Sequence, residues 1–157
     1  MPVSIQREPI DVASEYAQLV GPRPGAAVAT FTGYVRDHSD AHAVSQLELE
    51  HYPEMALKVL MALGERAADQ FGLSRWRIVH RYGLLDVAET IVWVGAVAEH
   101  RGEAISASEL MMDTLKTDAP FWKREQSPDG HVWVGVKQSI RIVARDGGQR
   151  RKREVLQ

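Results

Sequence analysis

Hydrophobic residues recur at helical spacing in two long segments of the chain. The first begins at Pro53, a residue favoured in the first turn of a helix, and ends at Gly72. The second covers 101–117 and is followed by Pro120. A shorter helix is predicted after Asp11, whose side chain can cap it. The positions expected to face the core are Val12, Tyr16, Leu19 and Val20, then Met55, Val59, Leu60, Leu63, Ala67 and Phe71, then Ile105, Leu110, Met111 and Leu115.

Runs of β-forming residues separate these helices. Residues 26–35 are largely apolar and predict a buried strand, in which Gly33 marks a bulge or a close approach of the backbone. Residues 36–43 are polar and predict a loop, and residues 84–88 predict a short connection. Further strands are predicted at 3–7, 44–52, 75–83, 89–100 and 131–140, with an extended segment at 121–125 and a turn at 127–130.

The order of these elements indicates the fold class. Several strands are joined by short turns, and strands and helices do not alternate regularly along the chain. The sequence therefore predicts an α+β fold, a mostly antiparallel sheet with two main helices, rather than a doubly wound parallel sheet. The 157 residues suit one domain, expected at 1–140, with a basic tail at 141–157. The basic run 150–153 indicates a solvated or disordered segment, with a docking role as the alternative.

Composition narrows the classes of function. The formal net charge of −2 gives no overall attraction to nucleic acid or to an anionic membrane. No apolar run approaches the roughly 20 residues of a membrane span, and the N-terminus has no apolar signal-peptide core, so a cytoplasmic location is expected. The chain has no cysteine, which excludes disulfides, zinc–thiolate sites and cysteine nucleophiles. Any sulfur that the protein handles must arrive on another molecule.

Three short stretches carry candidate binding residues. His100 and Arg101 fall at a strand-to-helix junction, where a helix N-terminus and a guanidinium favour an anion; the alternative is a surface arginine beside a packed histidine. Arg36 lies where an apolar strand enters a loop, and it is either functional or simply solvated. The histidines His38 and His42 with their neighbouring aspartates lie in a short polar loop, so no metal site is expected. The remaining histidines, His51, His80 and His131, are expected to be packed or on the surface.

The stretch LKTDAPFWKRE holds two lysines on either side of a rigid turn. Lys116 closes a helix, Pro120 bends the chain, and Lys123 follows two large aromatic residues. The bend can bring both ammonium groups to one pocket; the alternative is one helix-end lysine and one exposed strand lysine. A free lysine has a pKa of about 10.4, so use as a base at pH 7 needs a downward shift of about 3 units. Burial against the aromatic residues and nearby arginines would act in that direction.

Taken together, the stretches ATFTGYVRDH, LELEHYPEMA, VHRYGLL, AEHRGEA, LKTDAPFWKRE and SPDGHVWV resemble the MoaE family, the catalytic (large) subunit of molybdopterin synthase. The resemblance implies an α+β fold with a hammerhead-like motif and a homodimer within a heterotetramer. It implies a small ubiquitin-like partner whose C-terminal Gly-Gly ends in a thiocarboxylate. It also implies transfer of two sulfurs to cyclic pyranopterin monophosphate, which forms the molybdopterin dithiolene without a bound cofactor or metal. Gly147 and Gly148 are internal, so the sulfur carrier must be a separate chain.

The same resemblance assigns roles to residues. Lys116 and Lys123 match the two catalytic lysines. We expect Lys123 to stabilise the thiocarboxylate and the oxyanion of its attacked carbonyl, and Lys116 to act in proton transfer or substrate activation; the two roles could be exchanged. The implied substrate-binding residues are Tyr34, Val35, Arg36, His100, Arg101, Lys116, Lys123, Arg124 and Glu125, and further pocket residues are Phe31, Met112 and Lys137. The alternatives are a non-catalytic module that binds a ubiquitin-like tail and an unrelated enzyme acting on a phosphorylated ligand.

Overall fold

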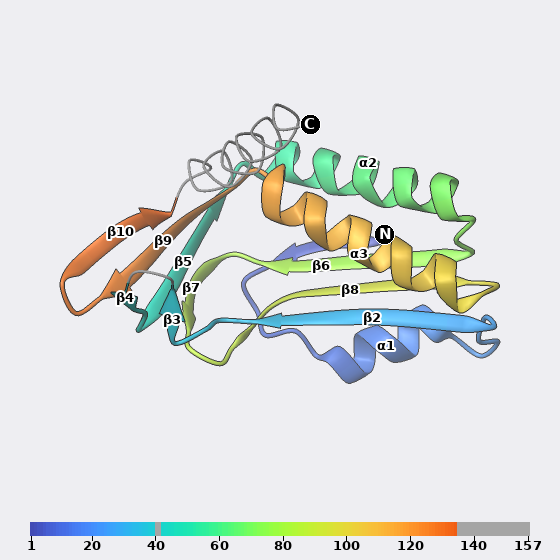
Figure 1. Ribbon diagram of the computed structural model, residues 1–157, viewed down its shortest axis with the longest axis horizontal. Coiled ribbons are helices and arrows are strands. Elements are labelled where there is room, and N and C mark those ends of the chain that lie inside the picture. The colour runs from blue at the N-terminus through green and yellow to red at the C-terminus, as the bar shows by residue number, and fades with distance from the viewer. Residues whose placement is uncertain (40–41, 135–157) are drawn as a thin grey trace, which may run out of the picture.

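The computed structural model describes residues 1–39 and 42–134. In this part of the chain, two four-stranded sheets and a two-stranded hairpin combine with three helices (Figure 1). The helices are α1 (Val12–Val20), α2 (Pro53–Phe71) and α3 (Arg101–Thr117). The first sheet has the order β1 (Val3–Gln6), β6 (Arg75–Arg81), β8 (Thr90–Ala98), β2 (Ala27–Tyr34). The second has the order β10 (Gly130–Val134), β9 (Phe121–Ser127), β5 (Gln46–His51), β7 (Gly83–Asp86), and the hairpin is β3 (His38–Ser39) with β4 (His42–Ala43).

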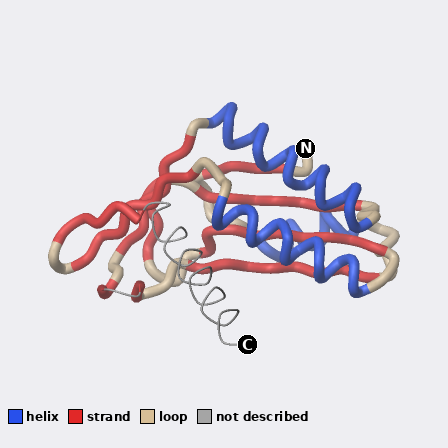
Figure 2. The backbone as a smooth tube through the Cα atoms, turned by 45° about the horizontal axis from the view of Figure 1, so that its top comes forward, coloured by secondary structure: helices blue, strands red, loops and turns tan. Residues whose placement is uncertain are grey.

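The first sheet is covered by helices on both faces. Helices α2 and α3 lie side by side on one face and α1 lies on the other, as Figures 1 and 2 show. The α2–α3 side encloses the largest apolar cluster, which includes Leu60, Ile78 and Met111. The α1 side holds a smaller cluster around Trp93. Apart from the parallel pair β1–β6, the strand pairs of this sheet are antiparallel, as expected from the sequence.

Local sequence explains where the helices begin and end. The Asp11 carboxylate accepts a hydrogen bond from the Ser14 backbone N–H at the start of α1. Helix α2 begins with Pro53, whose missing N–H costs nothing in a first turn. It ends at Gly72, which adopts the left-handed conformation (φ 62°, ψ 42°) that glycine tolerates best. These boundaries agree with the predicted ones.

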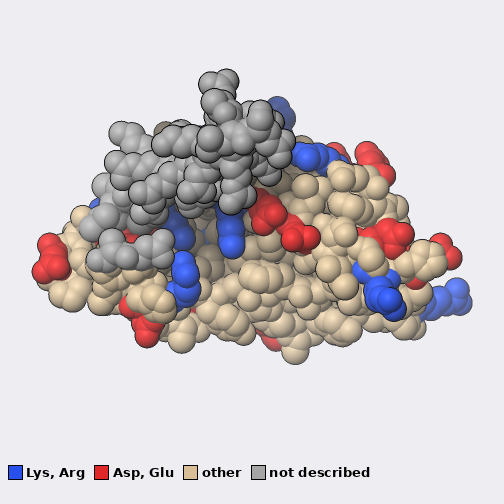
Figure 3. Space-filling view, in the orientation of Figure 1, with Lys and Arg blue, Asp and Glu red and all other residues tan. Residues whose placement is uncertain are grey.

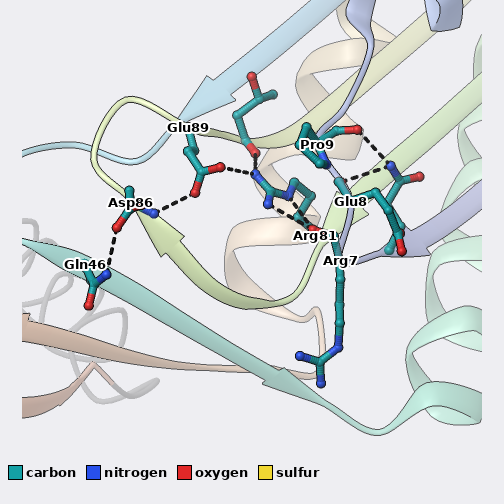
Figure 4. A network of polar contacts seen from close by, with 9 residues as sticks. Arg7, Glu8, Pro9, Gln46, Arg81, Asp86 and Glu89 are labelled. Carbon is teal, nitrogen blue, oxygen red and sulfur yellow. Dashed lines mark hydrogen bonds and ion pairs between the residues drawn. The ribbon is translucent and has the colours of Figure 1, made fainter.

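A buried arginine links the two sheets (Figure 4). The Arg81 guanidinium donates two hydrogen bonds to the Arg7 carbonyl, at 3.0 and 2.9 Å, and one to Glu89 at 3.2 Å. Glu89 also accepts from the Asp86 backbone N–H, and Asp86 accepts from Gln46 on β5, both at 2.7 Å. Through Glu89, the residue before β8, the network thus joins β6 of the first sheet to β7 and β5 of the second.

The structure corrects several predictions made from the sequence. One sheet was expected, whereas the strands divide into two. Residues 84–88 were predicted as a plain connection, yet β7 occupies most of them and pairs with β5. The predicted loop 36–43 contains the hairpin β3–β4. Periodicity also placed three residues in the core that are exposed, because no described element covers them: Tyr16, Met55 and Ile105.

The described helices include none that is long and apolar enough to cross a membrane. The predicted boundary between a domain at 1–140 and a tail at 141–157 falls outside the described residues, as does the end of the strand predicted at 131–140. Those two predictions therefore stay predictions.

Candidate active site

A cavity of about 560 Å³ lies where the end of β2, the end of α3 and the start of β9 meet. Its volume is in the range of small-molecule sites. Figure 3 shows Lys and Arg side chains near the junction of the two sheets, with acidic side chains close by. The residues that line the cavity are Phe31, Thr32, Gly33, Tyr34, Arg36, Leu49, His80, Ile91, Val92, Met112, Leu115, Lys116, Ala119, Phe121 and Lys123.

The chain bend after α3 brings both lysines to this cavity. Lys116 lies in the last turn of α3, and the Phe121 N–H donates to the Ala119 carbonyl at 2.8 Å in the turn that leads into β9. Lys123 then lies on β9, opposite Leu49 of β5. Both lysines line the cavity. The geometry is the one expected from LKTDAPFWKRE, with one lysine from a helix end and one from a strand.

Burial lowers the pKa of Lys123 below its ordinary value of 10.5. The Glu125 carboxylate opposes this shift, while the charges of Arg36 and Lys116 reinforce it. Desolvation and like charges both disfavour the ammonium form. The cavity therefore contains a lysine whose proton is held less tightly than in water.

Four other predicted residues also line the cavity: Phe31, Tyr34, Arg36 and Met112. Val35 does not, because its side chain is buried with Leu47, Leu49 and Leu85 in the core of the second sheet. Its backbone is engaged as well: its N–H donates to the Glu89 carbonyl and its carbonyl accepts from Ala88, both at 2.9 Å. The structure thus gives Val35 a packing role between two residues that face the cavity.

Arg124 and Glu125 lie beside Lys123 on β9 but do not line the cavity. Successive residues on a strand point to opposite faces, so Arg124 points away from Lys123 and pairs with Glu48 on β5. Glu125 is buried, and its Oε2 lies 2.9 Å from His42 Nε2 of the hairpin. Glu125 acts on the site through its charge, which favours the ammonium form of Lys123. Lys137 lies outside the described residues.

His100 and Arg101 lie at the opposite end of α3 from the cavity. His100 is the residue before the helix and Arg101 is its first residue, whereas Lys116 is in its last turn. At about 1.5 Å per residue, the helix separates Arg101 from Lys116 by about 22 Å. A single chain therefore does not bring this pair to the two lysines.

His80 lines the cavity, whereas the sequence predicted only that it is packed or on the surface. It lies two residues after Ile78 on β6, on the face that packs against α2 and α3. The sequence did contain a signal for this role, namely a histidine at a strand position that faces the core. A buried imidazole needs a polar partner, so such a position suggests a binding site. Its ring stacks on Phe121 with centroids 4.0 Å apart. Burial lowers the pKa of His80 to about 4, so the ring is neutral at pH 7.

The described residues contain no group of three or more His, Cys, Asp or Glu side chains that could hold a metal ion. Of the four residues considered for a metal in the polar loop, Asp40 lies outside the described residues. His38 instead lies 2.6 Å from the Asp37 carboxylate at the surface.

Comparison with known proteins decides the family. The family model described as "MoaE protein" matches residues 5–118. The chain belongs to the MoaE family. It is 41% identical over 138 residues to the molybdopterin synthase catalytic subunit of Escherichia coli (strain K12), which covers 88% of this chain and 92% of the relative. The family membership and the enzyme class expected from the motifs are confirmed.

Solved structures of this family share the fold. A molybdopterin synthase from Staphylococcus aureus superposes with a TM-score of 0.79 at 31% identity, over 86% of this chain and 98% of that chain. A complex of subunits 1 and 2 of the molybdopterin-converting factor from Helicobacter pylori has a TM-score of 0.71 at 18% identity, over 85% of this chain and 90% of that chain. The α+β fold class expected from the sequence is confirmed.

Proposed function

We propose that this chain is the catalytic subunit of a molybdopterin synthase. It transfers two sulfurs from the thiocarboxylated Gly-Gly terminus of a small ubiquitin-like partner to cyclic pyranopterin monophosphate. The observation that carries the proposal is that Lys116, Lys123 and Arg36 line one cavity in a member of the MoaE family. The burial that lowers the pKa of Lys123 supports it, because functional lysines are commonly shifted in this way.

We assign a different role in the reaction to each charged residue of the cavity. Arg36 binds the phosphate of the pterin, since a guanidinium matches phosphate oxygens. The thiocarboxylate sulfur forms a bond to a substrate carbon, a carbon–oxygen bond at that carbon breaks, and the oxygen leaves with a proton from Lys116. Water then attacks the acyl carbonyl, which becomes an oxyanion. The Lys123 ammonium stabilises that oxyanion, and Lys116 transfers protons. The carbon–sulfur bond of the acyl group breaks, the sulfur stays on the pterin, and the partner leaves with a carboxylate.

The partner is a separate small chain. The sequence has no cysteine that could carry sulfur, so a persulfide on this chain is not available. The related Helicobacter pylori protein was solved as a complex of two subunits, which supports a similar assembly here. We assign the reaction to the cytoplasm and the assembly to a heterotetramer built on a homodimer.

Edge strand β2 suggests how the homodimer forms. Strand β2 is at the edge of the first sheet, and beside it a groove of about 440 Å³ runs between β2 and α3. Exposed apolar side chains border this groove, among them Phe31 and Ile105. β2 and α3 run in the same direction in Figure 1. Two-fold pairing of β2 with β2 of a second copy would place that copy's His100 and Arg101 next to this chain's cavity.

A subunit-mixing experiment tests this arrangement. Lys116→Ala and Arg101→Ala are each expected to abolish most activity as pure dimers. In a mixed dimer, one site has both substitutions and the other has neither. Random exchange of an equimolar mixture makes about half of the dimers mixed, so about a quarter of all sites, and of wild-type activity, should be recovered. The measurement is turnover after subunit exchange. Mixtures no more active than the two pure variants would show that each site takes both residues from one chain.

Reconstitution tests the function itself. The chain is mixed with a small Gly-Gly partner carrying a C-terminal thiocarboxylate and with cyclic pyranopterin monophosphate, and dithiolene formation is measured. Stoichiometric consumption of two thiocarboxylates per pterin is expected. A chain that binds the partner but forms no dithiolene would instead be a non-catalytic module for ubiquitin-like tails.

A further inference from the structure

The imidazole of His80 is held rigidly in the wall of the cavity. The residue is 8% exposed and lies on β6, where strand pairing places its backbone. Its ring is nearly parallel to Phe121, with an interplanar angle of 14°, and the Phe121 ring in turn stacks against His51 at 5.8 Å. This column of rings leaves the His80 plane little freedom to rotate. The ring is therefore presented to the cavity in one orientation.

One hydrogen bond settles which ring nitrogen carries the proton. His80 Nδ1 lies 2.8 Å from the Arg81 carbonyl oxygen. A carbonyl only accepts, so Nδ1 is the donor, and in the neutral ring Nε2 holds a lone pair. Burial, together with the charge of Lys123, lowers the pKa of His80 to about 4 against the opposing effect of the hydrogen bond with the Arg81 carbonyl. The lone pair on Nε2 is thus available throughout the neutral pH range.

His80 Nε2 is open to the cavity. Within the described part of the chain, no hydrogen bond uses this atom, and it is not among the solvent-inaccessible side-chain atoms that lack a partner. The ring itself lines the cavity. An acceptor that no described residue bonds, and that is not sealed from solvent, is therefore presented to whatever the cavity binds.

The charged groups around this acceptor can only donate. Arg36, Lys116 and Lys123 line the same cavity, and none of these side chains accepts a hydrogen bond when charged. These donors suit the oxygens of a phosphate and of a thiocarboxylate, which accept hydrogen bonds. A pterin ring also has a polar edge with amino and lactam N–H groups, which need acceptors on burial. We propose that His80 is a substrate-binding residue whose Nε2 accepts a hydrogen bond from this N–H edge of the pterin ring.

This inference rests on the proposed function, and a matched pair of variants tests it. The asparagine amide occupies the place of Nδ1 and the glutamine amide that of Nε2. His80→Asn therefore keeps the bond to the Arg81 carbonyl and removes the cavity acceptor, whereas His80→Gln does the reverse. Binding of cyclic pyranopterin monophosphate is measured by calorimetry on the complex with the carboxylate form of the small partner, which cannot turn over.

We expect His80→Asn to raise the Kd for the pterin by about tenfold and His80→Gln to raise it by less than about threefold. Inorganic phosphate, the ring-free probe, should bind equally well to both variants and to the wild type. If His80 served only packing, the Arg81 carbonyl bond would matter more, so His80→Gln would be the more damaged variant. That order, or wild-type pterin affinity in His80→Asn, overturns the inference.

Two further cases need separate treatment: a His80→Asn variant that fails to fold, and a wild-type complex that does not bind the pterin. If His80→Asn fails to fold, His80→Gln is compared with His80→Leu, since both lack the bond to Arg81 and only glutamine supplies an acceptor. Glutamine should then bind the pterin at least about fivefold more tightly than leucine, and equal binding overturns the inference. If the wild-type complex does not bind the pterin at all, the proposed function itself fails, which is a different result from a wild-type complex that binds without help from His80.

Discussion

Lys123→Ala is expected to lower the rate of sulfur transfer by about a hundred- to a thousandfold, the usual cost of removing one donor to an oxyanion. Lys123 lines the cavity together with Lys116 and Arg36, and the substitution removes a cation from the place where negative charge develops. The measurement is single-turnover dithiolene formation with thiocarboxylated partner. Lys58→Ala is the control, because Lys58 is an exposed lysine on α2. Near-normal turnover in Lys123→Ala would contradict the assigned role.

The pH profile separates the two roles that a lysine can have. Because burial lowers the pKa of Lys123, its ammonium form is lost at a pH below the ordinary value of 10.5. If the ammonium stabilises the oxyanion, the wild-type rate falls as the pH rises through this lowered pKa. Lys123→Arg stays charged and should lack that fall. A rate that instead rises over the same range would give Lys123 the proton-transfer role and Lys116 the electrostatic one.

Arg81→Ala is expected to lower the free energy of unfolding by about 2–3 kcal/mol, because it removes a buried guanidinium that hydrogen-bonds the Arg7 carbonyl and pairs with the partly exposed Glu89. The Arg7 carbonyl loses both of its guanidinium donors, and Glu89 loses its ion-pair partner while it keeps the bond from the Asp86 backbone N–H. Urea denaturation followed by circular dichroism measures the change. Gln46→Ala, at the exposed end of the same network, should cost less than about 1 kcal/mol. Equal effects of the two substitutions would show that the network does not depend on Arg81.

Arg81→Ala should also change the geometry of the cavity, in addition to lowering the free energy of unfolding. Arg81 supplies the carbonyl that fixes the His80 tautomer, and it joins the sheet that carries His80 to the sheet that carries Lys123. The backbone carbonyl survives the substitution, so any change in pterin affinity reports displacement of the two sheets rather than loss of a hydrogen bond. A fully active Arg81→Ala protein at low temperature would show that the sheets keep their positions without this network.

Much of the local structure could be predicted from the sequence. The boundaries of α2 follow from Pro53 and Gly72, since proline and glycine act through their own backbone geometry. The bend in LKTDAPFWKRE allows both lysines to reach one pocket, but the residues alone left open one helix-end lysine and one exposed strand lysine; the structure places both side chains at the cavity. These features depend on neighbours in the chain, and the short-range rules of helix caps and turns describe such neighbours well.

The remaining features depend on pairing between distant segments. β7 carries little sequence signal and exists because β5 pairs with it. Arg124 follows Lys123 directly, but the pleat of β9 turns its side chain away from the cavity.

The sequence by itself determined the family and the helices, because local spacing and short motifs carry that information, and it named Lys116 and Lys123 as candidates for one pocket. Only the tertiary structure decided that burial lowers the pKa of Lys123, that Val35 belongs to a core, and that His80 lines the cavity. Burial and electrostatic environment are set by side chains from several strands and helices at once. They exist only after the two sheets have come together.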